Sequence, residues 1–139
     1  MSSRWSATCA RCDPVLFDTD VLIWVFRGNQ AAARMVEQAR ERAVSVMTHM
    51  ELVQGARSKQ EVKAIKGFLA DFAFAVLPLT ENIGHRAMVY MEEYSLRSGM
   101  GAGDALVAAT AVEQGLPLCT ANRKHYRLVQ DLQLKVLRP

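Results

Sequence analysis

The chain has 139 residues, of which 50% are hydrophobic and 22% are charged, and its formal net charge is +3 at pH 7. This composition excludes a disordered or low-complexity chain, and the length corresponds to one ordinary domain with a buried core. Apolar stretches fall short of the ~18 residues that a membrane span needs, and the opening MSSRWSATCARCD lacks the apolar segment of a signal peptide. We therefore expect a cytoplasmic protein whose mild basic excess permits nucleic acid as a partner.

The three cysteines are an odd number in a chain without a secretion signal, so we expect reduced thiols rather than disulfides. Cys9 and Cys12 have the CxxC spacing of half a zinc site, but no second CxxC or histidine pair completes four ligands. We interpret residues 1–13 as a poorly ordered N-terminal extension and residues 14–139 as a single domain.

Short β-rich runs alternate with amphipathic segments along the rest of the chain. The first half predicts a strand at 15–17, a helical turn at 21–26, a helix from 29 to about 42, a strand at 43–47 and a helix at 48–58. The second half predicts a helix at about 60–73, a strand at 74–79, helices at about 80–98 and 103–114, a strand at 116–120, a turn or short helix at 122–129 and a strand at 134–137. This order is typical of an α/β protein with helices on both faces of a mainly parallel sheet.

The predicted helix at about 103–114 is apolar almost all round, which indicates burial, yet Asp104 stands in its first turn. A carboxylate in that position must be exposed at a rim, satisfied by backbone N–H groups or held against a cation. Other polar residues follow the predicted strands, namely Asp18, Asp20, Glu51 and Asn122. Because ligands of such sheets sit at the carboxyl ends of the strands, we expect these side chains to face one crevice.

Each acid also has a purely structural interpretation. Thr48 and Glu51 have the spacing of a capping box, Asp18 or its neighbour Thr19 suits a helix N-cap, and Asp104 suits a first turn. However, acids that project from apolar segments into one cleft repel one another without a cation. Oxygen ligands suit Mg²⁺ or Mn²⁺, which activate water and neutralise charge on a phosphodiester, whereas the histidine spacing gives zinc little support.

The segments VLFDTDVLIWVFRG, VSVMTHMELVQGA, GAGDALVAATAVEQGLPLCTANRKHYRLV and LKVL resemble a PIN domain of the VapC type, the ribonuclease toxin of bacterial toxin–antitoxin pairs. The resemblance covers residues 15 to 139 and implies a three-layer α/β/α fold. It implies that Asp18, Glu51 and Asp104 bind Mg²⁺ or Mn²⁺, and that Asn122 stands where many members carry a fourth acid. Thr19 and Thr120 match hydroxyl positions beside the metal. An asparagine at 122 supplies no charge, which favours a site with one metal or one completed by substrate.

The same resemblance implies an Mg²⁺-dependent endoribonuclease that cleaves tRNA, rRNA or mRNA and is neutralised by a VapB-like antitoxin. An antitoxin segment would place an arginine or lysine against the three acids and a helix in an apolar groove, for which Val25 and Phe26 are candidates. The basic stretch at Arg123 and Lys124 is interpreted either as a phosphate-positioning edge or as a solvated turn.

The resemblance also implies a homodimer, which we expect to use the stripe of Tyr90, Met91 and Tyr94 on the long helix. The alternative functions are a PIN-like module that binds RNA or a partner without cutting it, and a receiver-type regulatory domain. The complete set of three acids argues against the first, and the position of Lys135 argues against the second.

Overall fold

The computed structural model describes residues 14–139, so the predicted N-terminal extension, with Cys9 and Cys12, lies outside the described residues. A five-stranded sheet runs through this part of the chain, built from β1 (Val15–Phe17), β2 (Arg42–Ser45), β3 (Ala75–Leu77), β4 (Leu118–Thr120) and β5 (Leu134–Val136). The spatial order is β3-β2-β1-β4-β5, and every neighbouring pair is parallel. From β1 the chain first moves outward to β3 and then returns to the other side of β1 for β4. Sheets of this type open a crevice at such a reversal, here between β1 and β4.

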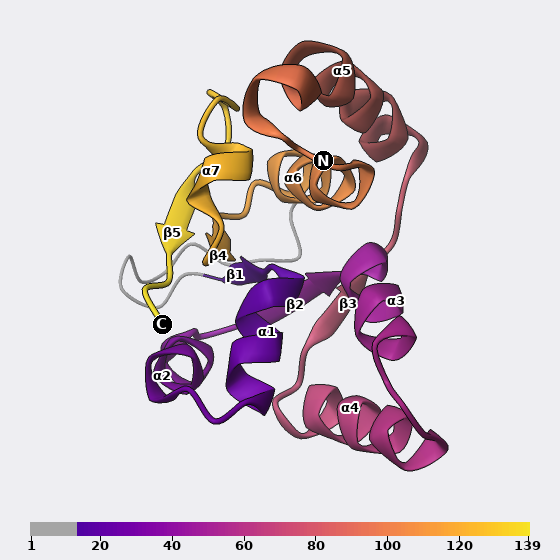
Figure 1. Cartoon of the computed structure of the whole chain (residues 1–139), viewed down its shortest axis with the longest axis vertical. Helices are drawn as coiled ribbons and strands as arrows, with labels where there is room; N and C mark the ends of the chain where they lie inside the picture. Colours follow the sequence, from indigo (N-terminus) through magenta and orange to yellow (C-terminus); the bar gives the residue numbers. More distant parts are fainter. Residues whose placement is uncertain (1–13) are drawn as a thin grey trace.

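Seven helices accompany the sheet within the described residues: α1 (Thr19–Phe26), α2 (Gln30–Gln38), α3 (Val46–Gln54), α4 (Lys59–Asp71), α5 (Glu81–Ser98), α6 (Ala102–Gln114) and α7 (Arg123–Tyr126). Figure 1 shows α1, α2 and α4 on one side of the sheet and α5 and α6 on the other. The three-layer α/β/α arrangement predicted from the sequence is confirmed. No helix in residues 14–139 combines the length and the apolar character needed to cross a membrane.

Each face of the sheet carries its own buried cluster. One unites Leu16 and Leu118 of the sheet with α5, α6 and Tyr126, and the other unites Phe17 and Val44 with α1, α2 and α4. Helix α6 is buried through most of its length, as its apolar sequence predicts. It therefore forms a rigid support for the residues of its first turn.

Capping groups place several helix boundaries away from the predicted ones. Ser45 caps α3 by accepting the Thr48 N–H at 3.0 Å, so the helix begins at Val46 rather than at residue 48. Helix α2 ends at Gln38 rather than near 42, because Ala39 is extended and Arg42 enters β2. The Arg42 guanidinium then donates to the carbonyls of Val36, Glu37 and Phe72 and ties the end of α2 to the end of α4.

The stripe expected to form a dimer face on the long helix points inward instead. Tyr90 is buried, and Met91 and Tyr94 pack against the cluster that also holds α6. The exposed apolar side chains of α5 are Met88, Val89 and Leu96, which lie on its other side. The stripe is explained by burial within one chain, because α5 packs along α6 more extensively than any other two elements pack.

Candidate active site at the carboxyl ends of the strands

Asp18 lies where β1 ends, in the crevice between β1 and β4. It also caps α1, since its Oδ1 accepts the Thr19 N–H at 2.8 Å. Its Oδ2 accepts two hydroxyl hydrogen bonds, from Thr120 at 2.9 Å and from Tyr126 at 2.9 Å. The side chain is buried, and desolvation together with the nearby charge of Asp20 raises its pKa to about 7.

Asp20 stands beside Asp18 and belongs to the same site. Its Oδ2 accepts the Ala121 N–H at 3.1 Å and lies 3.4 Å from the Thr120 hydroxyl. Its Oδ1 is buried and has no hydrogen-bond partner among residues 14–139. Burial raises the pKa of Asp20, and the charge of Asp104 adds to the increase. The predicted set of metal ligands omitted Asp20, although its place just beyond a strand was a usable signal.

Asp104 faces the same crevice from the first turn of α6. Its Oδ2 accepts the Gly101 N–H at 3.0 Å and lies 2.8 Å from His125 Nδ1, while its Oδ1 lies 3.2 Å from the Tyr126 hydroxyl. The first-turn interpretation is therefore correct in part, because a backbone N–H at the helix start does bind this carboxylate. The other carboxylate oxygen is directed at the side chains of the crevice.

Glu51 approaches this group from α3. Its Oε1 accepts the Thr19 hydroxyl at 2.8 Å, and this hydroxyl lies 3.0 Å from that of Thr48. The predicted capping box of Thr48 and Glu51 is wrong, because Ser45 is the cap and Thr48 lies inside α3. Glu51 instead reaches α6, where a Cβ at Gly103 would stand 3.2 Å from its Oε2. The absence of a side chain at Gly103 leaves room for this carboxylate.

The segment after β4 supplies the remaining predicted residues. The Asn122 N–H donates to the Thr120 hydroxyl oxygen at 3.0 Å, and its side-chain amide lies 2.9 Å from His125 Nδ1. Asn122 therefore adjoins Asp104 through His125 rather than touching the acids itself. Arg123 and Lys124 are exposed on α7. The side chains of the crevice that sequence analysis missed here are His125, which it treated as part of a basic stretch, and Tyr126.

The donor chemistry of the crevice fits a hard divalent cation. Four carboxylates converge on it, two of them have raised pKa values, and the buried Oδ1 of Asp20 lacks a partner within the described residues. As they stand, however, no three His, Cys, Asp or Glu side chains in residues 14–139 form a group arranged to hold a metal ion. Glu51 is turned to Thr19, and Asp104 is turned partly to His125, so a cation would have to draw these side chains inward.

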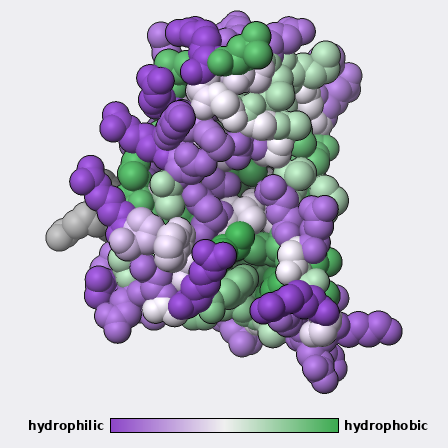
Figure 2. All heavy atoms as spheres, in the orientation of Figure 1, coloured by the Kyte–Doolittle hydropathy of each residue, from purple (hydrophilic) through white to green (hydrophobic). Residues whose placement is uncertain are grey.

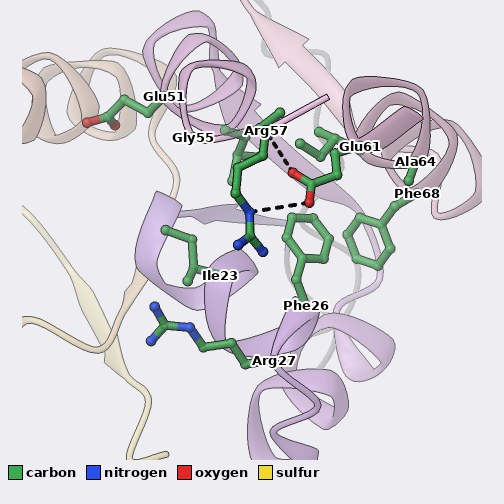
Figure 3. Close-up of a pocket in the computed structure, with 12 residues that line it drawn as sticks. Ile23, Phe26, Arg27, Glu51, Gly55, Arg57, Glu61, Ala64 and Phe68 are labelled. Carbon is green, nitrogen blue, oxygen red and sulfur yellow. Dashed lines mark hydrogen bonds and ion pairs between the residues drawn. The ribbon is translucent and has the colours of Figure 1, made fainter. Parts of the chain in front are cut away.

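An apolar groove of about 600 Å³ opens next to Glu51, between α1, α3 and α4. Its floor includes Ile23, Phe26 and Phe68, and the Phe26 and Phe68 rings meet edge to face at 5.1 Å. Figure 3 shows the Glu51 carboxylate turned away from these rings, at the margin of the groove. Figure 2 shows apolar surface on the same part of the molecule. Val25, the other predicted groove residue, is half-buried and packs against the core instead of lining the groove.

The fold agrees with comparisons to known proteins. The family model described as PIN domain matches residues 15–130. The chain belongs to the PIN domain family. It is 37% identical to ribonuclease VapC10 of Mycobacterium tuberculosis, over 86% of this chain and 90% of the relative, and 30% identical to ribonuclease VapC19 of the same organism, over 85% and 96%. Within the PIN family it is thus of the VapC type.

Solved structures show the same PIN fold in toxin–antitoxin complexes. A toxin–antitoxin complex from Klebsiella pneumoniae has a chain that is 28% identical, with a TM-score of 0.73 and coverage of 85% of this chain and 94% of that one. DNA-bound VapBC from Salmonella typhimurium gives a TM-score of 0.75 at 20% identity, covering 88% and 97%. This second likeness concerns the fold alone.

Proposed function

We propose that this chain is a Mg²⁺-dependent endoribonuclease toxin that a cognate VapB-like antitoxin neutralises. The observation that carries the proposal is the convergence of Asp18, Asp20, Glu51 and Asp104, from three separate segments, on the crevice beside β1 and β4. Relatives named ribonuclease over nearly the whole chain support the reaction class. A module that only binds RNA or a partner has no need of a buried, mutually repelling carboxylate group.

In this proposal Asp18, Glu51 and Asp104 hold Mg²⁺ or Mn²⁺. Asp20 adds its negative charge next to Asp18 and strengthens the attraction for the cation. The cation, when bound, supplies activation of water and neutralisation of charge at the phosphodiester. Thr19 and Thr120 orient the ligands, since their hydroxyls bond to Glu51 and Asp18. Asn122 acts at the same rim through His125, and its amide leaves any second cation with weak support.

RNA would lie along the rim formed by α7. Arg123 and Lys124 are exposed there, next in sequence to the residues that contact Asp104. Such cations bind phosphate oxygens and position the backbone without reading sequence, so the proposal includes tRNA, rRNA and mRNA. A loop or single strand is the favoured substrate, because its backbone can enter the crevice.

The antitoxin is proposed to occupy the apolar groove and to place an arginine or lysine against the acids. Glu51 lines the margin of the groove and also approaches the crevice, so one bound segment could reach both. A homodimer is also proposed, now through the exposed Met88 and the shallow apolar hollow between α5 and α6, rather than through Tyr90.

The proposed reaction is tested by removing one ligand charge at a time. We expect Asp18→Asn and Asp104→Asn each to reduce cleavage of a fluorescent RNA by at least about 100-fold, because an amide is a poor ligand for Mg²⁺. The exposed Asp71→Asn on α4 is the matched control and should cleave like wild type. Mg²⁺-dependent cleavage retained by either variant, in protein shown to be folded by circular dichroism, would contradict the assignment. RNA binding without any cleavage by wild type would favour the binding module.

A further inference from the structure

Tyr126 is a fully buried residue at the end of α7, and its phenol hydroxyl reaches two carboxylates from distant parts of the chain. The hydroxyl lies 2.9 Å from Asp18 Oδ2 and 3.2 Å from Asp104 Oδ1. Asp18 follows the central strand β1, whereas Asp104 belongs to α6 on one face of the sheet. The phenol is therefore a direct link between the two layers that carry the acids.

The hydrogen-bond partners of the two carboxylates show why this link matters. Asp18 is also held by the Thr19 N–H and the Thr120 hydroxyl, and Asp104 by the Gly101 N–H and His125. None of these four partners reaches both Asp18 and Asp104, although Thr120 also lies 3.4 Å from Asp20 Oδ2. Tyr126 is within hydrogen-bond distance of both, and Oδ1 of Asp104 contacts no other donor within residues 14–139 at hydrogen-bond distance.

A phenol can perform this task without itself becoming an anion. Burial and the charges of Asp18 and Asp104 raise the pKa of Tyr126, so the hydroxyl keeps its proton near pH 7. The ring is packed into the core with α6 and β4, which fixes the position of the oxygen. A single hydroxyl has one hydrogen to donate, so it donates to one carboxylate at a time while remaining close to the other.

We propose that Tyr126 is a positioning residue that keeps the Asp18 and Asp104 carboxylates next to each other, so that one divalent cation can draw both of them in as ligands. The proposal rests on the proposed function, because it takes these two acids as metal ligands. Partners that orient ligating carboxylates typically change metal affinity by about 10–100-fold when they are removed. The loss should therefore appear in binding as well as in cleavage.

The first test is Mn²⁺ binding to the full chain by titration calorimetry, with Tyr126→Phe compared with wild type. The variant keeps the ring and removes only the hydroxyl, and we expect at least about tenfold weaker binding. Tyr90→Phe is the matched control, because the buried Tyr90 hydroxyl donates to Asp131, away from the crevice. It should bind Mn²⁺ as wild type does, whatever its melting temperature.

Affinity within twofold of wild type in a folded Tyr126→Phe would overturn the inference and leave the proposed function standing. Wild-type protein that binds no Mn²⁺ would contradict the proposed function and the inference together.

A second measurement needs no substitution at position 126. It uses ¹⁹F NMR of the chain labelled with 3-fluorotyrosine, which gives one signal for each of the three tyrosines. The signals are assigned with the variants Tyr90→Phe and Tyr94→Phe. Mg²⁺ should move the Tyr126 signal and leave that of Tyr90 in place, and a Tyr126 signal that does not move would also overturn the inference.

Discussion

At the scale of single residues, the site is a concentration of negative charge that the fold has partly removed from water. Asp18 is 6% exposed and still receives three hydrogen bonds, yet its pKa is raised, so desolvation and Asp20 outweigh the donors. A charge buried at this cost is unlike the solvated acids at most helix ends. The carboxylates are therefore better explained by a ligand than by capping alone.

This balance predicts an unusual dependence of stability on pH in metal-free protein. The ordinary pKa of an aspartate side chain is 3.8, whereas the pKa of Asp18 in the folded chain is about 7. Between pH 3.8 and pH 7 the folded state therefore binds more protons than the unfolded state. The free energy of unfolding should therefore fall as pH rises from about 4 to about 7. Urea unfolding in EDTA at several pH values measures this slope.

Asp18→Asn provides the comparison, because an amide does not titrate. We expect the variant to be more stable than wild type by more than about 1 kcal/mol at pH 7.5, with the difference vanishing near pH 4. Asp20, whose pKa is also raised, leaves a smaller slope of the same sign in the variant. Equal slopes for the two proteins would show that Asp18 is ionised at little cost in the folded chain.

At the scale of elements, the site depends on how closely α3 approaches the first turn of α6. Glu51 crosses this gap because Gly103 has no side chain, and a Cβ there would stand 3.2 Å from Glu51 Oε2 and 3.4 Å from Met47 Cε. Gly103 has no left-handed φ that would require glycine. Its value to the site is therefore space rather than backbone conformation.

Gly103→Ala should separate stability from activity. Alanine favours helix over glycine by up to about 1 kcal/mol, so we expect a melting temperature equal to wild type or slightly higher. Cleavage should fall by about tenfold, because the new methyl group displaces the Glu51 carboxylate. Gly67→Ala in α4 is the matched control, since nothing lies within 4 Å of its Cβ position, and it should leave cleavage unchanged. Full activity in Gly103→Ala would mean that Glu51 does not need its present position.

At the scale of the whole molecule, the groove and the crevice adjoin each other at Glu51. Glu51 belongs to both, since it lines the groove and bonds to Thr19 of the crevice. The apolar side chains of the groove come mainly from α1 and α4, with Leu52 from α3, and none of them is among the acids of the site. A partner could therefore gain affinity from the groove and inhibit through the acids.

Phe26→Ala tests whether the antitoxin gains its affinity from the groove. The ring is 44% exposed and packs against Phe68, so its loss should weaken antitoxin binding by at least about tenfold at little cost to the fold. Leu79→Ala is the control, because Leu79 is 38% exposed and lies outside the groove. Surface plasmon resonance with the purified antitoxin measures both. Equal affinities for the two variants would place the antitoxin elsewhere.

In the same complex, excess Mg²⁺ or Mn²⁺ should partly restore cleavage if an inserted basic side chain displaces the cation. Replacing that side chain with alanine should weaken inhibition more than binding. Inhibition that responds to neither change would mean that the antitoxin blocks RNA at the rim.

The sequence alone determined the layers and the parallel sheet, and it brought all four converging acids to one crevice, although the predicted metal ligands did not include Asp20. Alternation of apolar strands with amphipathic helices leaves few ways to bury both faces of a sheet, and parallel strands bring their carboxyl ends to one edge. Asp18, Glu51 and Asp104 were predictable because each follows a strand or opens a buried helix. The roles of these residues came from the resemblance to VapC proteins rather than from spacing.

Only the tertiary structure decided which side chains meet at that edge. Tyr126 and His125 contact Asp104 from about twenty positions further along the chain, and the orphaned oxygen of Asp20 is defined by its packing. The inward orientation of Tyr90 and the use of Ser45 as a cap were equally invisible in the local pattern. Hydrophobic periodicity indicates that one face of an element is buried. The hydrogen-bond partner of each polar atom, in contrast, depends on contacts between segments far apart in sequence.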